Sequence, residues 1–473
     1  MEHRTHPYTI VVNLWRVFYL FIFPVIRGFF AALQSGIVQW ARGAWVDILF
    51  FLFMVTLATL QWRAQKYVCD NRGIRVMSGL FFRRDTFIRW DCMSTLSINS
   101  PFFLHPIHVS VLRADTIGGS NKNTDVALYL STSRAREILS FCRESSLSVP
   151  AQRRYRPRAT SIMALGLLDS NSLTGILFIA TFISQAGRLL GNEFSDLIVD
   201  TFETLIRSLS AGIPPAATAV AYISVAGWLI AFARTILRYM NFLIIRGEGG
   251  LSIKSGRFTK RDHLVNYDKI NFIDIRQTLG LKMLKLYSLY IYAVGYGKRK
   301  DDIACVLPAE RESVFKEYRS VFFPNFVPCE REIAPKRGGF MRFISKPLYL
   351  LIIILIAIMS LSYSIPPWKD VVVFIGIMSM LPSLLFLMVR LYDFLTCGVG
   401  RNGNFYTIRY SKGFQLHTII VSADKIVKVE IRQGLLQRPF HNCDLYFHTM
   451  AEGRSRHRCR NLRLYEVEDF LKV

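Results

Sequence analysis

Six apolar stretches, arranged in three pairs, constrain the fold of this chain more than any other feature of its sequence. Residues 213–233 and 371–389 carry no charged side chain, and an arginine follows each. A helix needs about 20 apolar residues to cross the hydrocarbon core of a bilayer, where its backbone polar groups must be paired within the helix. The stretches therefore predict membrane-spanning helices. They lie at residues 9–26, 44–62, 170–187, 213–233, 347–367 and 371–389.

The net charge of +25 is concentrated beside and between these pairs. The basic run 153–158 lies next to an apolar stretch, whereas the connection 191–212 carries four acidic residues and one arginine. Lysine and arginine near membrane ends mark the cytoplasmic side, where they also meet anionic head groups. We therefore expect the segments 63–160, 237–346 and 391–473 and both termini to be cytoplasmic, and the connections near 34–43, 191–212 and 364–370 to lie outside.

The charged segments between the apolar pairs repeat one another. Residues 78–85 match residues 255–262 at a constant spacing of 177 positions. In the third segment, residues 424–426 and 431–433 match residues 268–270 and 275–277 at a spacing of 156. The sequence thus predicts three copies of one module, each following a helix pair.

The repeated module is predicted to be rich in strands. Val427, Val429 and Ile431 alternate with charged residues, the period-two pattern of a strand with one face in solvent. Each copy then ends in a stretch with helical spacing, at residues 132–147, 308–322 and 464–473. Short strands followed by one helix predict a small barrel or sandwich whose open end the helix covers.

Two sequence motifs resemble those of a known family. An early S-G-x-F-x-[RK]-R-D in the first two copies and a later D-K-I-x-x-[IV]-x-I-R-Q in the second and third resemble the bacterial PH-like membrane proteins. The chain is most similar to the YdbT-like type, the long form with several PH-like (bPH2) domains. The third copy departs from the pattern, since its turn at 410–413 lacks the Arg-Arg-Asp element.

The predicted fold is an α-helical membrane protein with six transmembrane helices in three pairs and three cytoplasmic α+β PH-like barrel domains. Each domain is a small antiparallel β-barrel with a C-terminal helix. The helix pairs are predicted at 1–62, 160–238 and 343–395, and the domains at 63–150, 239–330 and 396–473. The resemblance implies a multi-pass protein of the bacterial inner membrane. It also implies a smaller two-span partner with one PH-like domain, and a role in cell-envelope defence, including bacteriocin resistance.

Basic turns are the candidate contact sites. Arg83 and Arg84 in the first domain match Lys260 and Arg261 in the second. Such turns can contact anionic lipids of the cytoplasmic leaflet or a protein partner. Ordinary solvated turns are an equally good interpretation, and folds of this kind also bind peptides by adding a strand at a sheet edge.

Arg16 and Asp47 are candidate intramembrane charges, because ionisable groups within spans are costly and often functional. They favour the alternative function, a component of a transporter or exporter whose cytoplasmic domains regulate it. Contact of such side chains with the membrane interface is the competing explanation.

No repeated group predicts catalysis. His105 with His108, and His441 with Cys443 and His448, lack the spacing and the further ligands of a metal site. We therefore expect a non-enzymatic protein without cofactor or metal. The positive charge has no nucleic-acid-binding motif beside it, so nucleic acid is not an expected partner. The expected partners are lipids and the smaller PH-like protein, and the chain can also form an oligomer.

Overall fold

The computed structural model describes the chain in stretches, and every structural statement below refers to these residues. They are residues 2–17, 45–70, 72–80, 82–116, 124–146, 153–168, 215–247, 249–296, 304–366, 369–450 and 456–472.

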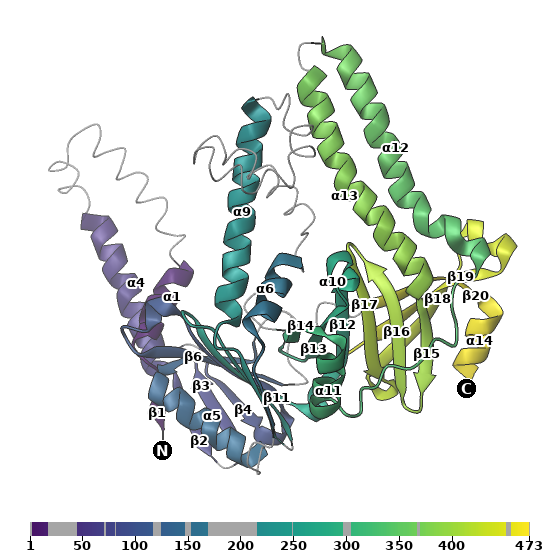
Figure 1. The fold of residues 1–473 in the computed structure, drawn as a ribbon. Coiled ribbons are helices and arrows are strands. Elements are labelled where there is room, and N and C mark those ends of the chain that lie inside the picture. Colours follow the sequence, from purple (N-terminus) through teal and green to yellow (C-terminus); the bar gives the residue numbers. More distant parts are fainter. Residues whose placement is uncertain are drawn as a thin grey trace. The chain divides into compact units, whose positions relative to one another are not determined.

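The β-rich segments share one order of elements, namely three strands, a short 3-10 turn, three further strands and a helix (Figure 1). The first copy consists of β2 (Lys66–Asp70), β3 (Gly73–Ser78), β4 (Arg84–Arg89), η1 (Trp90–Cys92), β5 (Met93–Ser100), β6 (Val109–Thr116), β7 (Val126–Ser131) and α5 (Thr132–Ser146). The second consists of β9 (Leu243–Arg246), β10 (Gly250–Ser255), β11 (Lys260–Asn266), η3 (Tyr267–Lys269), β12 (Ile270–Thr278), β13 (Leu286–Ala293), β14 (Cys305–Arg311) and α11 (Glu312–Phe322). The third consists of β15 (Gly398–Asn402), β16 (Phe405–Lys412), β17 (Gln415–Ser422), η6 (Ala423–Lys425), β18 (Ile426–Arg432), β19 (Asn442–Thr449), β20 (Arg456–Arg463) and α14 (Leu464–Lys472).

Helices separate the copies. They are α1 (Tyr8–Val17) and α4 (Trp45–Ala64) before the first copy, α6 (Ala159–Leu168) and α9 (Pro215–Tyr239) before the second, and α12 (Phe340–Ser364) and α13 (Lys369–Thr396) before the third. Smaller elements complete the described chain: β1 (His3–Arg4), β8 (Arg153–Tyr155), α10 (Leu279–Met283), η2 (Phe102–Leu104), η4 (Arg337–Gly339) and η7 (Leu435–Phe440).

The two halves of a copy belong to different sheets, because neighbouring copies exchange strands. In the first shared sheet, β7, β6 and β5 of the first copy continue into β11, β10 and β9 of the second, with β8 at the edge. In the second shared sheet, β14, β13 and β12 continue into β17, β16 and β15 of the third. We call the antiparallel pair β5–β11 the first junction and the pair β12–β17 the second junction.

Packing divides the chain into two compact units. Unit 1 comprises Met1–Arg154 and Ile244–Lys269, and unit 2 comprises Tyr155–Leu243 and Ile270–Val473. Each unit therefore contains one junction. The predicted domain boundaries follow the copies along the sequence and stay a prediction, whereas packing places strands of two copies together in each unit.

The two junctions have the same register. Leu264 lies opposite Leu96 in the first junction, and Ile420 lies opposite Ile273 in the second. These pairs are related by the repeat spacings found in the sequence, 156 from Leu264 to Ile420 and 177 from Leu96 to Ile273. All four side chains are buried. The strand exchange is thus a repeated feature of the module, with one apolar pair at a fixed position.

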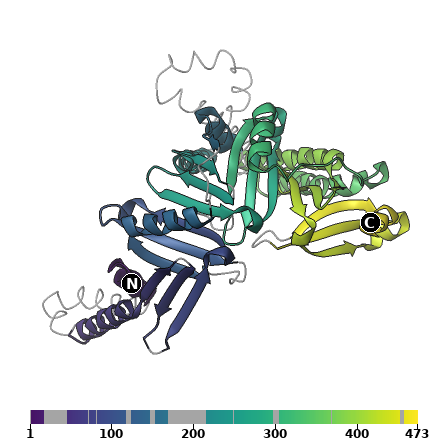
Figure 2. The same cartoon turned by 90° about the horizontal axis from the view of Figure 1, so that it is seen from below.

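The 3-10 turn after the third strand contributes a tryptophan to the core of unit 1. Trp90 in η1 is buried, and its indole Nε1 donates a hydrogen bond of 2.9 Å to the carbonyl oxygen of Asp70. Its ring lies 6.3 Å from that of Phe141 in α5. Figure 2 shows α5 lying across the strands of this unit, where it covers the cluster that contains Leu96 and Leu264.

The S-G motif has a conformational cause in the turn between the second and third strands of a copy. Gly79 and Gly256 have φ values of +109° and +86°, which side chains with a Cβ rarely adopt. A Cβ at either position would also lie within 2.0 Å of a carbonyl oxygen, that of Phe82 or of Thr259. The third copy makes a shorter turn at Gly413, between β16 and β17.

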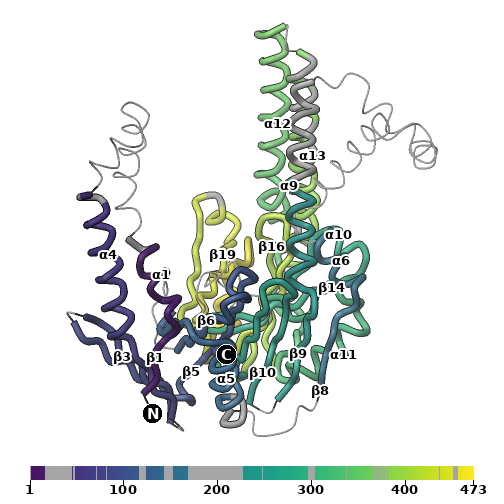
Figure 3. Tube along the Cα trace, turned by 90° about the vertical axis from the view of Figure 1, so that its left-hand side faces the viewer, coloured from purple at the N-terminus to yellow at the C-terminus, as the bar shows by residue number. Residues whose placement is uncertain are grey.

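Helices α12 and α13 form an antiparallel hairpin in unit 2 (Figures 1 and 3). Phe340 and Phe343 of α12 pack edge-on against Phe394 of α13, with ring centroids 5.2 and 5.5 Å apart. Near the other end, a Cβ at Gly376 would lie 2.2 Å from Cγ1 of Ile358, so the helices approach closely there. The base of α13 is fixed to β16 by Arg390, which donates hydrogen bonds to Ser411.

The prediction of six membrane-spanning helices is wrong. Among the described residues, one helix is long and apolar enough to cross a membrane, α12 (Phe340–Ser364). Shorter apolar helices run over Ile48–Ala64 and Ala159–Leu168. Beyond the predicted span 371–389, α13 carries the buried pair Arg390 and Asp393 beside Ser411 of β16. The predicted span at 170–187 and the connection at 191–212 lie outside the described residues.

The prediction of one closed barrel for each copy also needs correction. The pattern of alternating residues identified the strands, but it carried no information about which copy supplies the neighbouring strand. In the structure each copy contributes three strands to one sheet and three to another. Strand β18 also differs from the predicted barrel strand with a buried apolar face. Its alternating apolar residues are exposed, namely Val427, Val429 and Ile431.

The buried apolar pair of the second junction predicts a measurable contribution to stability. Ile273→Ala should lower the free energy of unfolding by about 2–5 kcal/mol, because it removes packed methyl groups and leaves a cavity. Val429 occupies the equivalent position in the third copy but is exposed. Val429→Ala should therefore change the free energy of unfolding by less than about 0.5 kcal/mol. Denaturant unfolding of the purified protein in mild detergent measures both, and equal effects would contradict the structural difference.

Candidate functional site

The second junction encloses a charged cluster built on Asp274, Arg276 and His417. Arg276 donates a hydrogen bond of 2.6 Å from Nε to Oδ2 of Asp274, two residues earlier on β12. His417, on β17 of the third copy, brings its Nδ1 to 3.0 Å from the same oxygen. The side chains of Asp274 and His417 are almost completely buried, and that of Arg276 is 9% exposed. Two copies therefore supply one buried ion cluster.

Aromatic rings surround this cluster. The guanidinium carbon of Arg276 lies 3.9 Å from the ring centroid of Tyr290, and one of its nitrogens donates to the hydroxyl of Tyr292. On the other side the ring of His417 stacks on Tyr410, with centroids 5.2 Å apart and planes inclined by 17°. Electrostatic attraction is strong in such an environment, because little water is present to screen it.

Electrostatics in the cluster favour the ionised carboxylate. Burial by itself raises the pKa of Asp274, because it removes water from the charged form. The charges of His417 and Arg276 and their hydrogen bonds outweigh that effect and bring the pKa of Asp274 below its ordinary value. The cluster thus ties together the two copies at neutral pH.

The third copy repeats half of this cluster on its exposed strand. Glu430 and Arg432 of β18 stand 156 positions after Asp274 and Arg276. Arg432 donates a hydrogen bond of 2.6 Å to Glu430, and this bond lowers the pKa of Glu430 to about 2. His448 Nε2 lies 3.2 Å from the second oxygen of Glu430. In the first copy the equivalent positions are Ser97 and Asn99, which have no charge.

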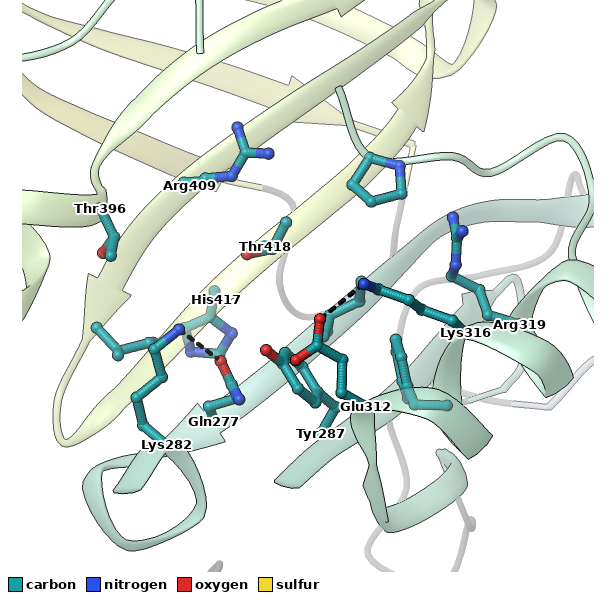
Figure 4. Close-up of a pocket in the computed structure, with 14 residues that line it drawn as sticks. Gln277, Lys282, Tyr287, Glu312, Lys316, Arg319, Thr396, Arg409, His417 and Thr418 are labelled. Atoms are coloured by element: carbon teal, nitrogen blue, oxygen red, sulfur yellow. Dashed lines mark hydrogen bonds and ion pairs between the residues drawn. The ribbon is translucent and has the colours of Figure 1, made fainter. Parts of the chain in front are cut away.

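A pocket of about 250 Å³ lies at the second junction (Figure 4). Four cationic side chains line it, from three different elements: Lys282, Lys316, Arg319 and Arg409. Its lining also includes apolar and aromatic side chains, namely Ile275, Phe315, Tyr287 and Leu416. One carboxylate is present, that of Glu312, and Lys316 Nζ lies 2.7 Å from it.

The bonding of the basic groups leaves the pocket positive. Arg319 donates to the carbonyl of Phe326 at 2.9 Å, and Lys282 donates to Gln277 at 3.4 Å. The one carboxylate, Glu312, interacts electrostatically with Lys316 and with Lys282. Arg409 donates to the carbonyl of Cys329, and its other terminal nitrogen, Nη1, is buried without a hydrogen-bond partner among the described residues. Burial lowers the pKa of Arg409. The arrangement can hold a small anionic group with an apolar part.

The predicted basic turns lie in two different environments. Arg83 and Arg84 are exposed, and Arg84 begins β4, whose pairing partner in the described sheet is β3 alone. Lys260 and Arg261 begin β11, where they lie opposite Ser100 and Asn99 of β5. The first pair can therefore reach a lipid or a protein partner, while the second is already part of the first junction.

The candidate intramembrane charges lie on helices. Arg16 belongs to α1 and Asp47 to α4, but their side chains are outside the part of the structure that is described. Their roles stay a prediction.

Sequence reasoning did not find Asp274, His417 or Arg409. A signal for the first was present, since Asp274-Ile275-Arg276 and Glu430-Ile431-Arg432 both carry an acid two positions before an arginine. No pattern pointed to His417, because its role depends on which strand lies opposite β12.

The comparison with known proteins agrees with this architecture. The sequence profile described as the bacterial PH domain matches residues 17–146 and 194–320, which is more than half of the chain. The chain belongs to the bacterial PH domain family. The match covers the first two copies of the bacterial PH domain and does not include the third, whose turn departs from the motif.

A relative of the same kind is the transmembrane protein YdbT of Bacillus subtilis (strain 168). The two sequences are 22% identical over 392 residues, which is 77% of each chain. The resemblance to YdbT-like bPH2 proteins is thereby confirmed, and the chain is a membrane protein of this type. No solved structure matches it.

The buried cluster predicts a strong effect of a single substitution. Asp274→Asn should lower the free energy of unfolding by about 3–5 kcal/mol, because it leaves Arg276 buried without a counter-charge. Since the folded-state pKa of Asp274 is depressed, its contribution is complete above the unfolded-state pKa of about 4 and declines only at lower pH. Unfolding at neutral pH is therefore the measurement. Glu430→Gln, at the equivalent half-buried position of β18, is the matched control and should shift the midpoint far less.

Proposed function

We propose that this chain is a non-enzymatic, membrane-anchored assembly protein whose bacterial PH domains join other PH-like domains at the membrane surface. The observation that carries the proposal is the strand exchange at the two junctions. In both, one bacterial PH domain binds the next by extending a sheet, with an apolar pair at the same register. A module that binds its own kind in this way is equipped to bind a PH-like domain on another protein.

The proposed partner is a smaller membrane protein with two spans and one PH-like domain. Its support is the resemblance to YdbT-like proteins, together with the strand exchange. A role in envelope defence, including bacteriocin resistance, is part of the proposal on the same resemblance.

The proposed orientation places the β-rich domains and both termini in the cytoplasm of a multi-pass protein. Strands that precede the α12–α13 hairpin pair with strands that follow it, as β12 does with β17. If α12 crosses the membrane, the chain must therefore return through α13 to the side that it left. Strands β1 and β2 also pair with each other, and α1 and α4 lie between them in the sequence. The segment between these strands must therefore also start and end on one side of the membrane.

Contact with anionic lipids is proposed for the exposed basic side chains on this side. Arg83 is exposed, and its Nη2 lies 3.6 Å from the sulfur of Met77. Basic residues near an anionic leaflet each contribute about 1 kcal/mol of binding free energy. The net charge of +25 supports such contact.

Assembly predicts co-purification. A tagged chain extracted from native membranes in mild detergent should bring down a smaller two-span PH-like protein. The bound protein should be lost when the detergent is replaced by a denaturing one. Recovery of this chain without any such protein, both with and without prior cross-linking in the membrane, would contradict the proposed partner.

Orientation predicts a labelling pattern. Lys369→Cys, at the first residue of α13, should react on intact cells with a thiol reagent that does not cross membranes. The native Cys92, exposed in η1, should react only after the cells are opened. Labelling of Cys92 on intact cells would contradict a cytoplasmic location for the bacterial PH domains.

A further inference from the structure

Two strands at opposite ends of the repeat array each have one open edge. In the described sheets, β4 of the first copy pairs with β3 alone and β18 of the third copy pairs with β19 alone. Their equivalents in the other copies pair on both sides. Strands β11 and β17 correspond to β4, and β5 and β12 correspond to β18. The chain thus carries both strands that a third junction would need. One strand, β4, belongs to unit 1, and the other, β18, belongs to unit 2.

The side chains of β18 show the consequence of the open edge. Every residue of β5 and β12 is buried. In β18 the apolar residues are exposed instead, Val427 by 64%, Val429 by 36% and Ile431 by 38%. A strand whose alternating apolar residues lie in solvent marks an interaction surface, particularly when the same positions are covered elsewhere in the chain.

The open edge of β4 has a matching residue. Phe87 is 49% exposed, whereas Leu264, at the equivalent position of β11, is 3% exposed. Applying the common register of the two junctions to β4 and β18 sets Phe87 opposite Val429. The pairs Leu96 with Leu264, Ile273 with Ile420 and Val429 with Phe87 then occupy one position, and all are apolar.

The charged side chains of the second junction also have equivalents on β18 and β4. In the second junction the carboxylate of Asp274 is shared by Arg276 of its own strand and His417 of the opposite strand. The equivalents in a third junction are Glu430, Arg432 and Arg84. Arg84 would therefore replace His417 beside the carboxylate of Glu430, with Arg432 already bonded to it at 2.6 Å. A basic side chain from the opposite strand would thus again stand beside the carboxylate.

We propose that the β18 edge of one chain binds the β4 edge of a second copy of this chain, in the register that places Phe87 opposite Val429. The proposal rests on the proposed assembly function and names a partner and a contact for it. A second copy is the occupant because the same chain presents both complementary strands. Since the two surfaces differ, the contact is head-to-tail and leads to a ring or an open array.

Register-specific cross-linking tests the contact. Phe87→Cys is placed on a chain with one affinity tag and Val429→Cys on a chain with another, and both are expressed together in native membranes. Opposite positions of antiparallel strands have the spacing that a disulfide needs. Mild oxidation should yield a covalent dimer that carries both tags and disappears on reduction. Each single-cysteine chain with an unsubstituted partner, and Phe87→Cys with Lys428→Cys, are the matched controls and should give at most a tenth of this product.

A charge exchange provides a second test that does not depend on oxidation. Phe87→Lys and Val429→Glu should each reduce co-isolation of differently tagged copies at least fivefold. Co-expressing the two variants should recover most of it, because the unsubstituted β18 edge of the first variant can bind the unsubstituted β4 edge of the second, and the two substituted edges attract each other. Both positions are exposed in the single chain, and the unfolding midpoints of both variants should stay close to that of the unsubstituted protein.

The outcomes separate this proposal from the broader one. Absence of the two-tag dimer overturns the pairing of two copies. A chain that carries both Phe87→Cys and Val429→Cys provides the other decisive result: a disulfide that forms only within one such chain also overturns it. If the smaller PH-like protein still co-purifies, and Val429→Glu releases it, the proposed function stands and β18 binds that protein instead. If neither a second copy nor the smaller protein is found, both proposals fail.

Discussion

The antiparallel pairing between the third strand of one copy and the fourth strand of the preceding copy is the constraint on which the rest of the structure depends. It occurs twice, as β11 on β5 and as β17 on β12, in one register. Neither half of a bacterial PH domain forms its sheet with the other half, so no copy is complete without its neighbour. An array of this kind gains stability from the interfaces between repeats as well as from each repeat, as in other repeat proteins.

The same pairing restricts the helices. A segment that leaves a sheet at one strand and rejoins it at the next paired strand must start and end on the same side of any membrane that it enters. The α12–α13 hairpin meets this requirement, with Phe394 packed against α12 and Arg390 bonded to β16. The helical excursions therefore anchor the β-rich part without separating its strands, and a substitution at the base of α13 acts on the sheet as well as on the anchor.

Much of the local structure could be predicted from the sequence, whereas its connectivity could not. The motif around Gly79 and Gly256 located a turn that requires positive φ, and alternation identified β18 as a strand. Alternation does not say which strand lies alongside, so it gave a closed barrel for each copy and missed the partnership of Asp274 with His417, 143 residues away. Absence of charge was also too weak a criterion for spans, because among the described helices α12 alone is both long and apolar enough to cross a membrane.

The order of the strands along the chain has a consequence for synthesis. Strand β5 is made long before β11, since residues 101–259 must be translated first, including the described helices α5, α6 and α9. During that interval the edge of β5 is open and can pair with any complementary strand nearby. The repeated register does not by itself exclude a wrong partner, because β4 and β17 carry Phe87 and Ile420 at the position of Leu264. Correct folding of the array depends on this edge being kept free until its own strand emerges.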